Sequence, residues 1–501
     1  MKTTINYFSR VLCALLLCAG LVVTSCVEGL LENGGTTGNI QSSGSGNNGS
    51  ANNLNGNNED MDGVDPVTLE IGIVKAFSVS FNGCVNIPVS ELSSICILYS
   101  DAEQFDVRTA ERLSITSFDS DRNFKVTLTN LESLTKYNYC IYVKTKSSEE
   151  TYSEIQSFTT VGVTDLSSAA SANCYVISEF GVYKFKPLKG NSNTAVGRIA
   201  TAEILWESFG TDVTPLPNDL VCGVSYDDGY IIFETNEIFK KGNAVIAAKD
   251  VSGNILWSWH IWLTDQLQEQ VYFNDAGTMM DRNLGAISAT PGDVGALGLL
   301  YQWGRKDPFL GSSSIYGSQL AKSTGDWPSI EASDMSNGTV EYSIANPMTF
   351  ITCNLNNYDW IYSSDKTVDN TRWPETKNSK SIYDPCPAGW RVPDGGSEGV
   401  WVESEFRDAL YDTTNEGISF EISSPSTTWY PTSGFRCGNS DGGLYSVGIN
   451  GYFWSASPCD ISVYGLRYGN NGLVFTNEHF DRSYGFSIRC SKEQFSSPDD
   501  R

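Results

Sequence analysis

The sequence predicts a mainly β, multidomain protein, and three observations support this prediction. A length of 501 residues exceeds the usual size of one domain. Short runs of β-branched and aromatic residues recur between stretches rich in Gly, Asn and Ser, which favours strands joined by tight turns. One segment, 404–411, has helical spacing, with Phe406, Ala409 and Leu410 on the same face.

Residues 1–26 have the pattern of a targeting segment. Lys2 and Arg10 accompany an apolar run, residues 11–23, that is too short to remain as a membrane-spanning helix. Small residues then precede Cys26. This pattern resembles the lipobox of bacterial lipoproteins, which implies that the Cys26 thiol is acylated and anchors the chain by lipid at the surface of the outer membrane. An ordinary secretory peptide that contains a cysteine is the alternative.

The next segment, residues 27–65, is dominated by Asn, Gly and Ser. Such a composition cannot bury a core, so we expect a flexible tether. The tether carries no Lys or Arg, because the first basic residue after Arg10 is Lys75.

Residues 66–161 are predicted to form a β-sandwich. Residues 137–143 alternate so that Tyr137, Tyr139, Ile141 and Val143 share one face. The approach to this strand, Leu131-x-x-x-Thr135-x-Tyr137, resembles that of the late strand in fibronectin type III domains, where the tyrosine hydroxyl bonds back to the preceding turn. Further predicted strands are 77–81, 125–129 and 157–160.

Residues 164–266 are predicted to form a second β-sandwich. Its apolar runs of strand length are 204–206, 230–233, 244–248 and 255–262. In the last run Trp257, Trp259 and Ile261 share one face, and His260 and Trp262 share the other. We expect His260 to be packed or exposed and not to bind a metal, because no partner histidine lies nearby.

Composition excludes several classes of function. The formal net charge of −26 argues against a nucleic-acid partner, since phosphate binding needs a basic surface. His260 and His479 are the only histidines, and neither belongs to a zinc-binding or triad pattern. We therefore predict no catalytic residues, no metal site and no cofactor. Ten of the thirteen cysteines follow Cys26, and their residues alone leave the pairing open.

Residues 270–493 contain four ordered motifs. They are 298–308 (GLLYQWGRKDP), 383–393 (YDPCPAGWRVP), 451–457 (GYFWSAS) and 484–490 (YGFSIRC). In order and spacing they resemble the major paralogous domain first described in Fibrobacter, which is related to the C-type-lectin-like fold. The predicted fold class is therefore two N-terminal immunoglobulin- or fibronectin-III-like sandwiches followed by an α+β C-type-lectin-like domain.

The motifs themselves indicate scaffold. We expect Trp303, Trp390 and Trp454 to be core residues and not ligand contacts. Cys386 and Cys490 are predicted to form a disulfide, which would stabilise the domain by several kcal/mol in the chain-entropy treatment.

The stretch between Ser433 and Tyr484 differs, because aromatic residues are interleaved with Asn, Ser, Asp and Gly. Rigid aromatic contacts beside small polar groups are typical of binding loops. Tyrosine-rich strands of a small sheet are the alternative. The predicted ligand-binding residues are Phe435, Asn439, Tyr445, Phe453, Tyr464, Arg467, Tyr468, Asn470, Asn471, Phe475, Asn477, His479, Phe480 and Arg482.

The architecture as a whole resembles the tip adhesins of the Bacteroides-type (type V) pilus. The resemblance implies a non-enzymatic adhesin whose partners are a host or bacterial surface glycan or protein, with pilin subunits as further partners. The tether departs from that family, because pilin precursors are trimmed after a basic residue downstream of the lipobox. A free-standing lipidated adhesin is the alternative.

Two other classes remain. The lectin-like fold also occurs in a formylglycine-generating oxidase, which needs an active cysteine pair, and Cys437 and Cys459 are the candidates in the loop-rich region. A structural pilus or anchor subunit is the other class. The calcium-binding motifs of true C-type lectins are absent from the sequence, so we expect no required calcium.

Overall fold

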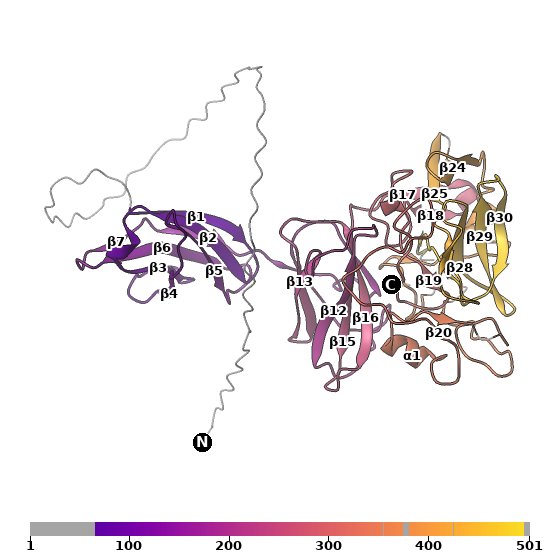
Figure 1. The fold of residues 1–501 in the computed structure, drawn as a ribbon, viewed down its shortest axis with the longest axis horizontal. Helices are drawn as coiled ribbons and strands as arrows, with labels where there is room; N and C mark the ends of the chain where they lie inside the picture. The colour runs from indigo at the N-terminus through magenta and orange to yellow at the C-terminus, as the bar shows by residue number, and fades with distance from the viewer. Residues whose placement is uncertain (1–65, 354, 374–379, 424, 495–501) are drawn as a thin grey trace, which may run out of the picture. The chain divides into compact units, whose positions relative to one another are not determined.

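The computed structural model describes residues 66–353, 355–373, 380–423 and 425–494 (Figure 1). This part of the chain is mainly β, as the sequence predicts. Its helices are short: α1 (Val340–Ala345), α2 (Val400–Glu403), and the 3-10 turns η1 (Val89–Glu91), η2 (Phe273–Asp275) and η3 (Val294–Ala296). None of these helices is long and apolar enough to cross a membrane. Cys26 and the predicted tether lie outside the described residues.

Two sheets form from residues 67–159. The first has the order β1-β2-β5, and in the second β4, β3, β6 and β7 follow one another while β8 also pairs with β6. The strands are β1 (Val67–Val74), β2 (Ser78–Val85), β3 (Leu92–Ser100), β4 (Glu111–Ser114), β5 (Asn123–Thr129), β6 (Lys136–Thr145), β7 (Glu150–Tyr152) and β8 (Gln156–Thr159). Side chains from both sheets, including Phe81 and Ile97, form one buried core.

Strand β6 has the predicted alternation. Tyr137, Tyr139, Ile141 and Val143 all lie in the core between the two sheets. The Tyr137 hydroxyl accepts a hydrogen bond from the backbone N–H of Glu132 at 3.0 Å. This bond fixes the turn that precedes β6, as the tyrosine pattern predicts.

A second pair of sheets follows, with orders β10-β16-β15-β12 and β13-β14-β11-β9. The strands are β9 (Val163–Asp165), β10 (Cys174–Ile177), β11 (Val182–Phe185), β12 (Thr201–Ser208), β13 (Val221–Asp227), β14 (Tyr230–Thr235), β15 (Gly242–Lys249) and β16 (Ile255–Leu263). Trp257, Trp259 and Ile261 lie in the core between these sheets. The edge pairs β10–β16 and β9–β11 are parallel, whereas the other pairs are antiparallel.

The opposite face of the β16 sheet packs on the residues that follow it. Trp206 and Trp262 share one hydrophobic core with Trp303 and Trp454. The Trp262 indole N–H donates to the carbonyl of Ala286 at 3.0 Å. Lys306 is buried and bonds through Nζ to the carbonyl of Ser258 at 3.0 Å. Residues 164–266 and 270–493 therefore stabilise each other through a common core.

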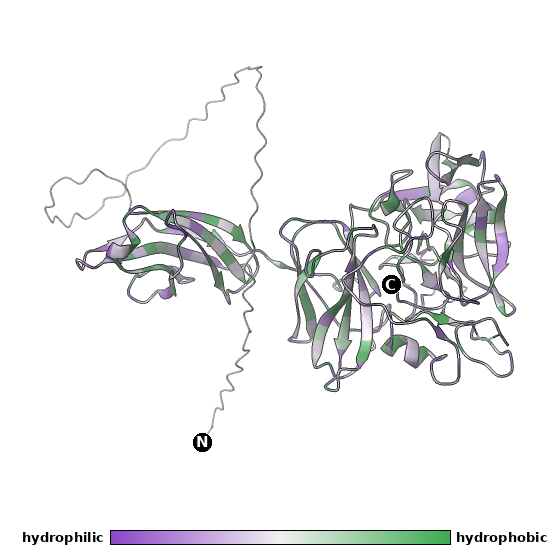
Figure 2. Cartoon of the chain, viewed as in Figure 1, coloured by the Kyte–Doolittle hydropathy of each residue, from purple (hydrophilic) through white to green (hydrophobic). Residues whose placement is uncertain are grey.

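Residues 269–492 form several small sheets. The strands are β17 (Glu269–Tyr272), β18 (Gly277–Met280), β19 (Tyr301–Gln302), β20 (Glu331–Ala332), β21 (Ile351–Thr352), β22 (Trp390–Arg391), β23 (Leu410–Asp412), β24 (Gly417–Ser423), β25 (Ser426–Pro431), β26 (Phe435–Arg436), β27 (Leu444–Tyr445), β28 (Asn450–Cys459), β29 (Ser462–Gly469), β30 (Val474–Phe480), β31 (Gly485–Phe486) and β32 (Ser491–Lys492). Sheets β19-β31-β26-β27 and β28-β29-β30 carry the predicted ligand-binding residues. Hydrophobic and hydrophilic residues are interspersed along the strands (Figure 2).

The predicted helix at 404–411 is wrong. Helix α2 ends at Glu403, and Glu405, Phe406 and Asp408 have positive φ values of 59°, 46° and 48°. Of the three apolar residues only Phe406 is buried, and its ring centroid lies 3.7 Å from that of Phe420. Ala409 is exposed, and Leu410 is 72% exposed. The apolar spacing thus does not mark one buried face.

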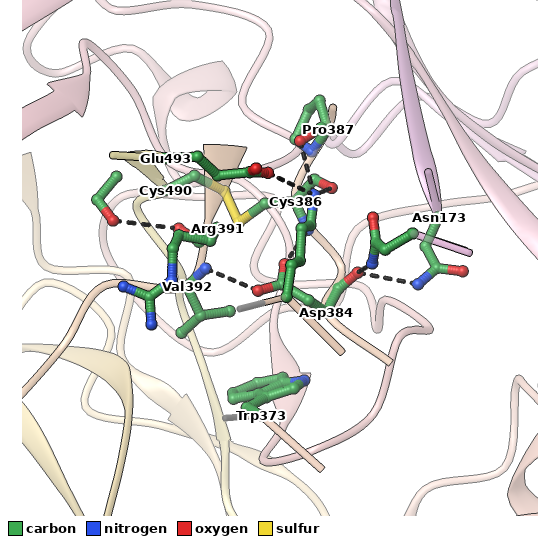
Figure 3. The surroundings of a disulfide bond; sticks show 12 residues. Asn173, Trp373, Asp384, Cys386, Pro387, Arg391, Val392, Cys490 and Glu493 are labelled. Atoms are coloured by element: carbon green, nitrogen blue, oxygen red, sulfur yellow. Dashed lines mark hydrogen bonds and ion pairs between the residues drawn. A yellow bond between two sulfur atoms is a disulfide. The ribbon is translucent and has the colours of Figure 1, made fainter. Parts of the chain in front are cut away.

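The disulfide between Cys386 and Cys490 is present, with a Cα–Cα distance of 6.1 Å across a sequence separation of 104 (Figure 3). Both cysteines are fully buried. The Asp384 carboxylate fixes the local backbone, because it accepts the N–H groups of Cys386 at 2.9 Å and Val392 at 3.0 Å. Asn173 donates to the carbonyl of Asp384 at 2.9 Å, which joins this loop to the sandwich that precedes it.

Of the three tryptophans that we expect in the core, Trp303 and Trp454 are fully buried and Trp390 is half-buried. The indole of Trp303 donates to the carbonyl of Ser455 at 3.0 Å, and that of Trp454 donates to the carbonyl of Tyr301 at 2.8 Å. The motifs that contain these residues therefore hold one another inside the core.

Candidate functional site

Five strands of the C-terminal sheets together carry an aromatic surface. We call it the aromatic face and define it as Phe435, Tyr445, Tyr452, Arg467, Phe475, Glu478 and Tyr484. Phe435 is its centre: ring centroids lie 5.9 Å away at Tyr445, 4.9 Å at Tyr452 and 5.5 Å at Tyr484. Tyr445 is 43% exposed and Phe475 is 38% exposed, so the face presents aromatic area to solvent.

The β29–β30 pair supplies the charged part of the face. Arg467 pairs with Glu478, with Nη2 3.1 Å from Oε1, and its guanidinium lies 4.3 Å from the ring centroid of Phe475. The pairing register runs from Gly465–Glu478 to Arg467–Phe475, so two steps on β29 match three on β30. This bulge brings Phe475 and Glu478 to the same side as Arg467.

Polar side chains lie at the edge of the face beside Phe435. Asn439 donates to the Tyr484 hydroxyl at 2.8 Å, and the Tyr445 hydroxyl donates to Asp441 Oδ2 at 2.8 Å. The backbone N–H of Gly443 and the Tyr445 hydroxyl both lower the pKa of Asp441. Asp441 in turn raises the pKa of Tyr445. The carboxylate therefore stays ionised and holds the tyrosine ring in one orientation.

Glycine permits the close approach that positions Tyr445. Gly434, directly before β26, has a φ of 65°, and a Cβ there would lie 2.2 Å from the carbonyl oxygen of Tyr445. A larger residue would push β27 away from β26 within the hairpin. The register Phe435–Tyr445 depends on this contact.

The structure distributes the predicted ligand-binding residues over four environments. On the aromatic face or its edge lie Phe435, Asn439, Tyr445, Arg467, Phe475 and, packed beneath Tyr452, Phe480. Asn470 and Asn471 are exposed at the β29–β30 turn, and Asn477 is exposed at the bulge of β30. Tyr464 and His479 form a separate pair, with ring centroids 4.9 Å apart. Because His479 precedes Phe480 on β30, it points to the opposite side of the sheet.

Three of the predicted ligand-binding residues are wrong, because they are fully buried. Phe453 packs in the core against Tyr430, with ring centroids 4.9 Å apart. Tyr468 donates its hydroxyl to the carbonyl of Pro431 at 2.6 Å inside that core. Arg482 lies 4.5 Å from the ring centroid of Trp303 and bonds to backbone carbonyls, including that of Asp369 at 2.9 Å.

The sequence prediction missed Tyr452, Glu478 and Tyr484. Tyr452 precedes Phe453 on β28, and the two point to opposite sides of the sheet. Knowledge of how β28 pairs with β29 would have identified Tyr452, because Tyr452 lies opposite Arg467. Nothing in the local sequence marks Glu478, since it reaches the face through the bulge.

A hollow lies on the surface of the first sandwich. It has a volume of about 700 Å³ and is lined mainly by polar residues of β1, β2 and β5, among them Glu70, Asn82 and Lys125. Two aromatic side chains belong to its lining, half-buried Phe118 and buried Phe124. Within the described residues, no group of three or more His, Cys, Asp or Glu side chains is placed to hold a metal ion.

No family model and no curated protein matches the chain. Among solved structures, the sensor domain of the anti-sigma factor RsgI4 from Pseudobacteroides cellulosolvens is 22% identical, with a TM-score of 0.16, and the match covers 20% of this chain and 99% of that one. The fn3 domain of human contactin 1 is 19% identical, with a TM-score of 0.17, and the match covers 23% and 95%.

Proposed function

We propose that this chain is a non-enzymatic, surface-anchored adhesin that binds a glycan or a protein through the aromatic face. One observation carries the proposal: partly exposed Tyr445 and Phe475 belong to one surface, held by strands and bordered by Asn439 and Asp441. Aromatic rings of this kind give contact area at a low cost in conformational entropy, and neighbouring amides and carboxylates supply hydrogen bonds. Because strands hold these side chains in place before a ligand binds, less conformational entropy is lost on binding.

The anchor is part of the same proposal. The segment that ends at Cys26 has the lipobox pattern, and the Asn/Gly/Ser composition of residues 27–65 suits a tether. A lipid on Cys26 would hold the chain at the outer membrane, where a net charge of −26 favours solubility. Incorporation into a pilus is not required for this role.

We further propose the finer fold arrangement: two fibronectin-III-like sandwiches followed by a C-type-lectin-like domain over residues 270–493. The Cys386–Cys490 bridge and the bonds that join the Trp303 and Trp454 motifs support a common scaffold for those residues. Strands β28, β29 and β30, which carry part of the aromatic face, pack on this scaffold. Loops on such a frame tolerate changes in sequence better than the strands that they connect.

The test uses the chain without residues 1–26, because residues 270–493 share a core with the preceding sandwich. Binding to glycan arrays and to host and bacterial cells is compared for the wild type, Tyr445→Ala and Tyr152→Ala. The control residue is matched, since Tyr152 on β7 is 42% exposed and Tyr445 is 43% exposed.

We expect Tyr445→Ala to weaken binding by about tenfold or more, as for a central contact residue. Tyr152→Ala should leave binding unchanged. Equal binding by both variants would reject the aromatic face as the site, and no binding by the wild type on any array or cell would reject the adhesin.

A further inference from the structure

The loop of the β26–β27 hairpin begins against the end of β21. Cys353 follows β21 directly, and its backbone N–H donates to the carbonyl of Gly438 at 2.6 Å. Gly438 is the neighbour of Cys437, which follows β26. Backbones joined by such a bond lie about 5 Å apart, and disulfides join α-carbons roughly 4.4–6.8 Å apart. The bond joins Cys353 to the residue that follows Cys437, so the two cysteines occupy neighbouring positions on adjacent backbones.

The environments of the two thiols overlap. Burial raises the pKa of the Cys353 thiol, and the charges of Asp481 and Cys437 raise it further. Burial raises the pKa of Tyr484 to about 12, and the charges of Asp481, Cys437 and Cys353 contribute to the shift. The two thiols thus lie near each other and near one tyrosine hydroxyl.

Glycine makes this approach possible. A Cβ on Gly438 would lie 2.3 Å from the carbonyl carbon of Ser483 and 2.4 Å from the nitrogen of Tyr484. The chain segments that contain Cys353, Cys437 and Tyr484 therefore pack closely around Gly438, which has no side chain. Cys437 is 9% exposed, and Ser440 donates to its sulfur at 3.0 Å.

We propose that Cys353 and Cys437 form a second disulfide, which ties the start of the β26–β27 loop to β21. Both are thiols in the structure, as are six other cysteines of the described residues. In the reaction one thiolate attacks the disulfide of an oxidant, either a disulfide-carrying protein or oxidised glutathione, and expels a thiol. The second cysteine then displaces the other thiol. The cysteines lose two protons and two electrons, and the oxidant is reduced to two thiols.

The bridge would close a covalent loop of residues 353–437 and would fix the first residue of the β26–β27 loop, which carries Asn439 and Asp441 and leads to Tyr445. The hairpin would then have fewer conformations available when its sheet opens locally. The proposal does not depend on ligand binding, because the linkage is detected chemically.

The test uses the chain from residue 27 onward, incubated with oxidised glutathione and unfolded in an alkylating reagent. Digestion needs trypsin and an aspartate-directed protease, because Cys437 and Cys459 share the tryptic peptide 437–467 and only a cut before Asp441 separates them. The Cys386–Cys490 linkage in the same sample shows that disulfides survive unfolding, alkylation and digestion. Cys353→Ser and Cys437→Ser are compared with Cys459→Ser.

We expect a linked product that joins the segment containing Cys353 to segment 437–440, with loss of alkylation at both cysteines. Each serine variant at 353 or 437 should restore alkylation of the remaining partner, and Cys459→Ser should not. Full alkylation of both cysteines while Cys386 and Cys490 are linked would overturn the proposal. So would a linkage of either cysteine to Cys459.

Discussion

The guanidinium of Arg467 lies over the ring of Phe475, 4.3 Å from the ring centroid. The two residues face each other across β29 and β30. An arginine above an aromatic face covers apolar area while its charge still reaches solvent. Arg467 and Phe475 therefore act as one surface element, and Glu478 fixes the guanidinium from the side.

The first prediction concerns the Arg467–Glu478 pair. Their side chains are 27% and 32% exposed, so water and salt screen the attraction. A double-mutant cycle with Arg467→Ala and Glu478→Ala should give a coupling energy of about 0.5–1 kcal/mol from urea unfolding, reduced in molar salt. The Lys492–Glu269 pair, 48% and 50% exposed, is the control and should couple less. A coupling that is unaffected by salt would contradict this account.

The second prediction concerns the turn before β6. Tyr137→Phe removes the hydroxyl that accepts the Glu132 N–H. The loss of one such bond costs about 1–2 kcal/mol, so hydrogen exchange at the Glu132 amide should accelerate by about tenfold or more. Tyr152→Phe alters a 42% exposed residue of the same sandwich and should leave that amide unchanged. Equal exchange rates in both variants would show that the bond does not stabilise the turn.

The mainly β class and the first pair of sheets could be predicted from the sequence because β6 is an uninterrupted strand. Its alternation assigns Tyr137 and Tyr139 to the core without knowledge of any neighbour. The site was harder, because both sides of β28 are buried: Phe453 lies in one core and Trp454 in another. Alternation then has no exposed side to identify, and Phe453 could not be told from Tyr452.

The bulge in β30 adds a second difficulty. It changes which residues share a side of the sheet, so that Phe475 and Glu478 both meet Arg467 although they are three positions apart. Aromatic and asparagine content indicates the region but does not divide it into two sides. Arg482 shows the same limit, since its burial depends on carbonyls such as that of Asp369, far away in the sequence.

The third prediction concerns pH. Burial lowers the pKa of His260 to about 3, whereas an unfolded chain binds the proton near pH 6.5. His260 Nε2 lies 2.9 Å from Asn243 Oδ1, its ring stacks on Trp262 and its Nδ1 has no hydrogen-bond partner, so nothing compensates a positive charge. Between pH 6.5 and about pH 3 the unfolded state therefore binds more protons, and stability falls as pH falls.

His260→Gln should remove this contribution. The wild type should lose up to about 1.4 kcal/mol of stability per pH unit more than the variant across that window. His479→Gln changes an exposed histidine and serves as the control. Urea unfolding at several pH values measures the slopes, and parallel slopes for the wild type and His260→Gln would exclude the buried histidine as their cause.

The last prediction separates backbone strain from steric contact at the aromatic face. Gly434 and Gly472 have φ values of 65° and 77°, but a Cβ on Gly434 would meet the Tyr445 carbonyl oxygen at 2.2 Å, whereas one on Gly472 would meet nothing within 4 Å. Gly472→Ala should thus cost about 1 kcal/mol for the left-handed backbone alone. Gly434→Ala should cost at least about 2 kcal/mol more, because backbone atoms must move.

If the hairpin positions Tyr445 for a ligand, only Gly434→Ala should also reduce binding to the ligand found on the arrays. Equal losses of stability in the two variants would show that the hairpin yields to the added methyl group, and binding should then persist in both.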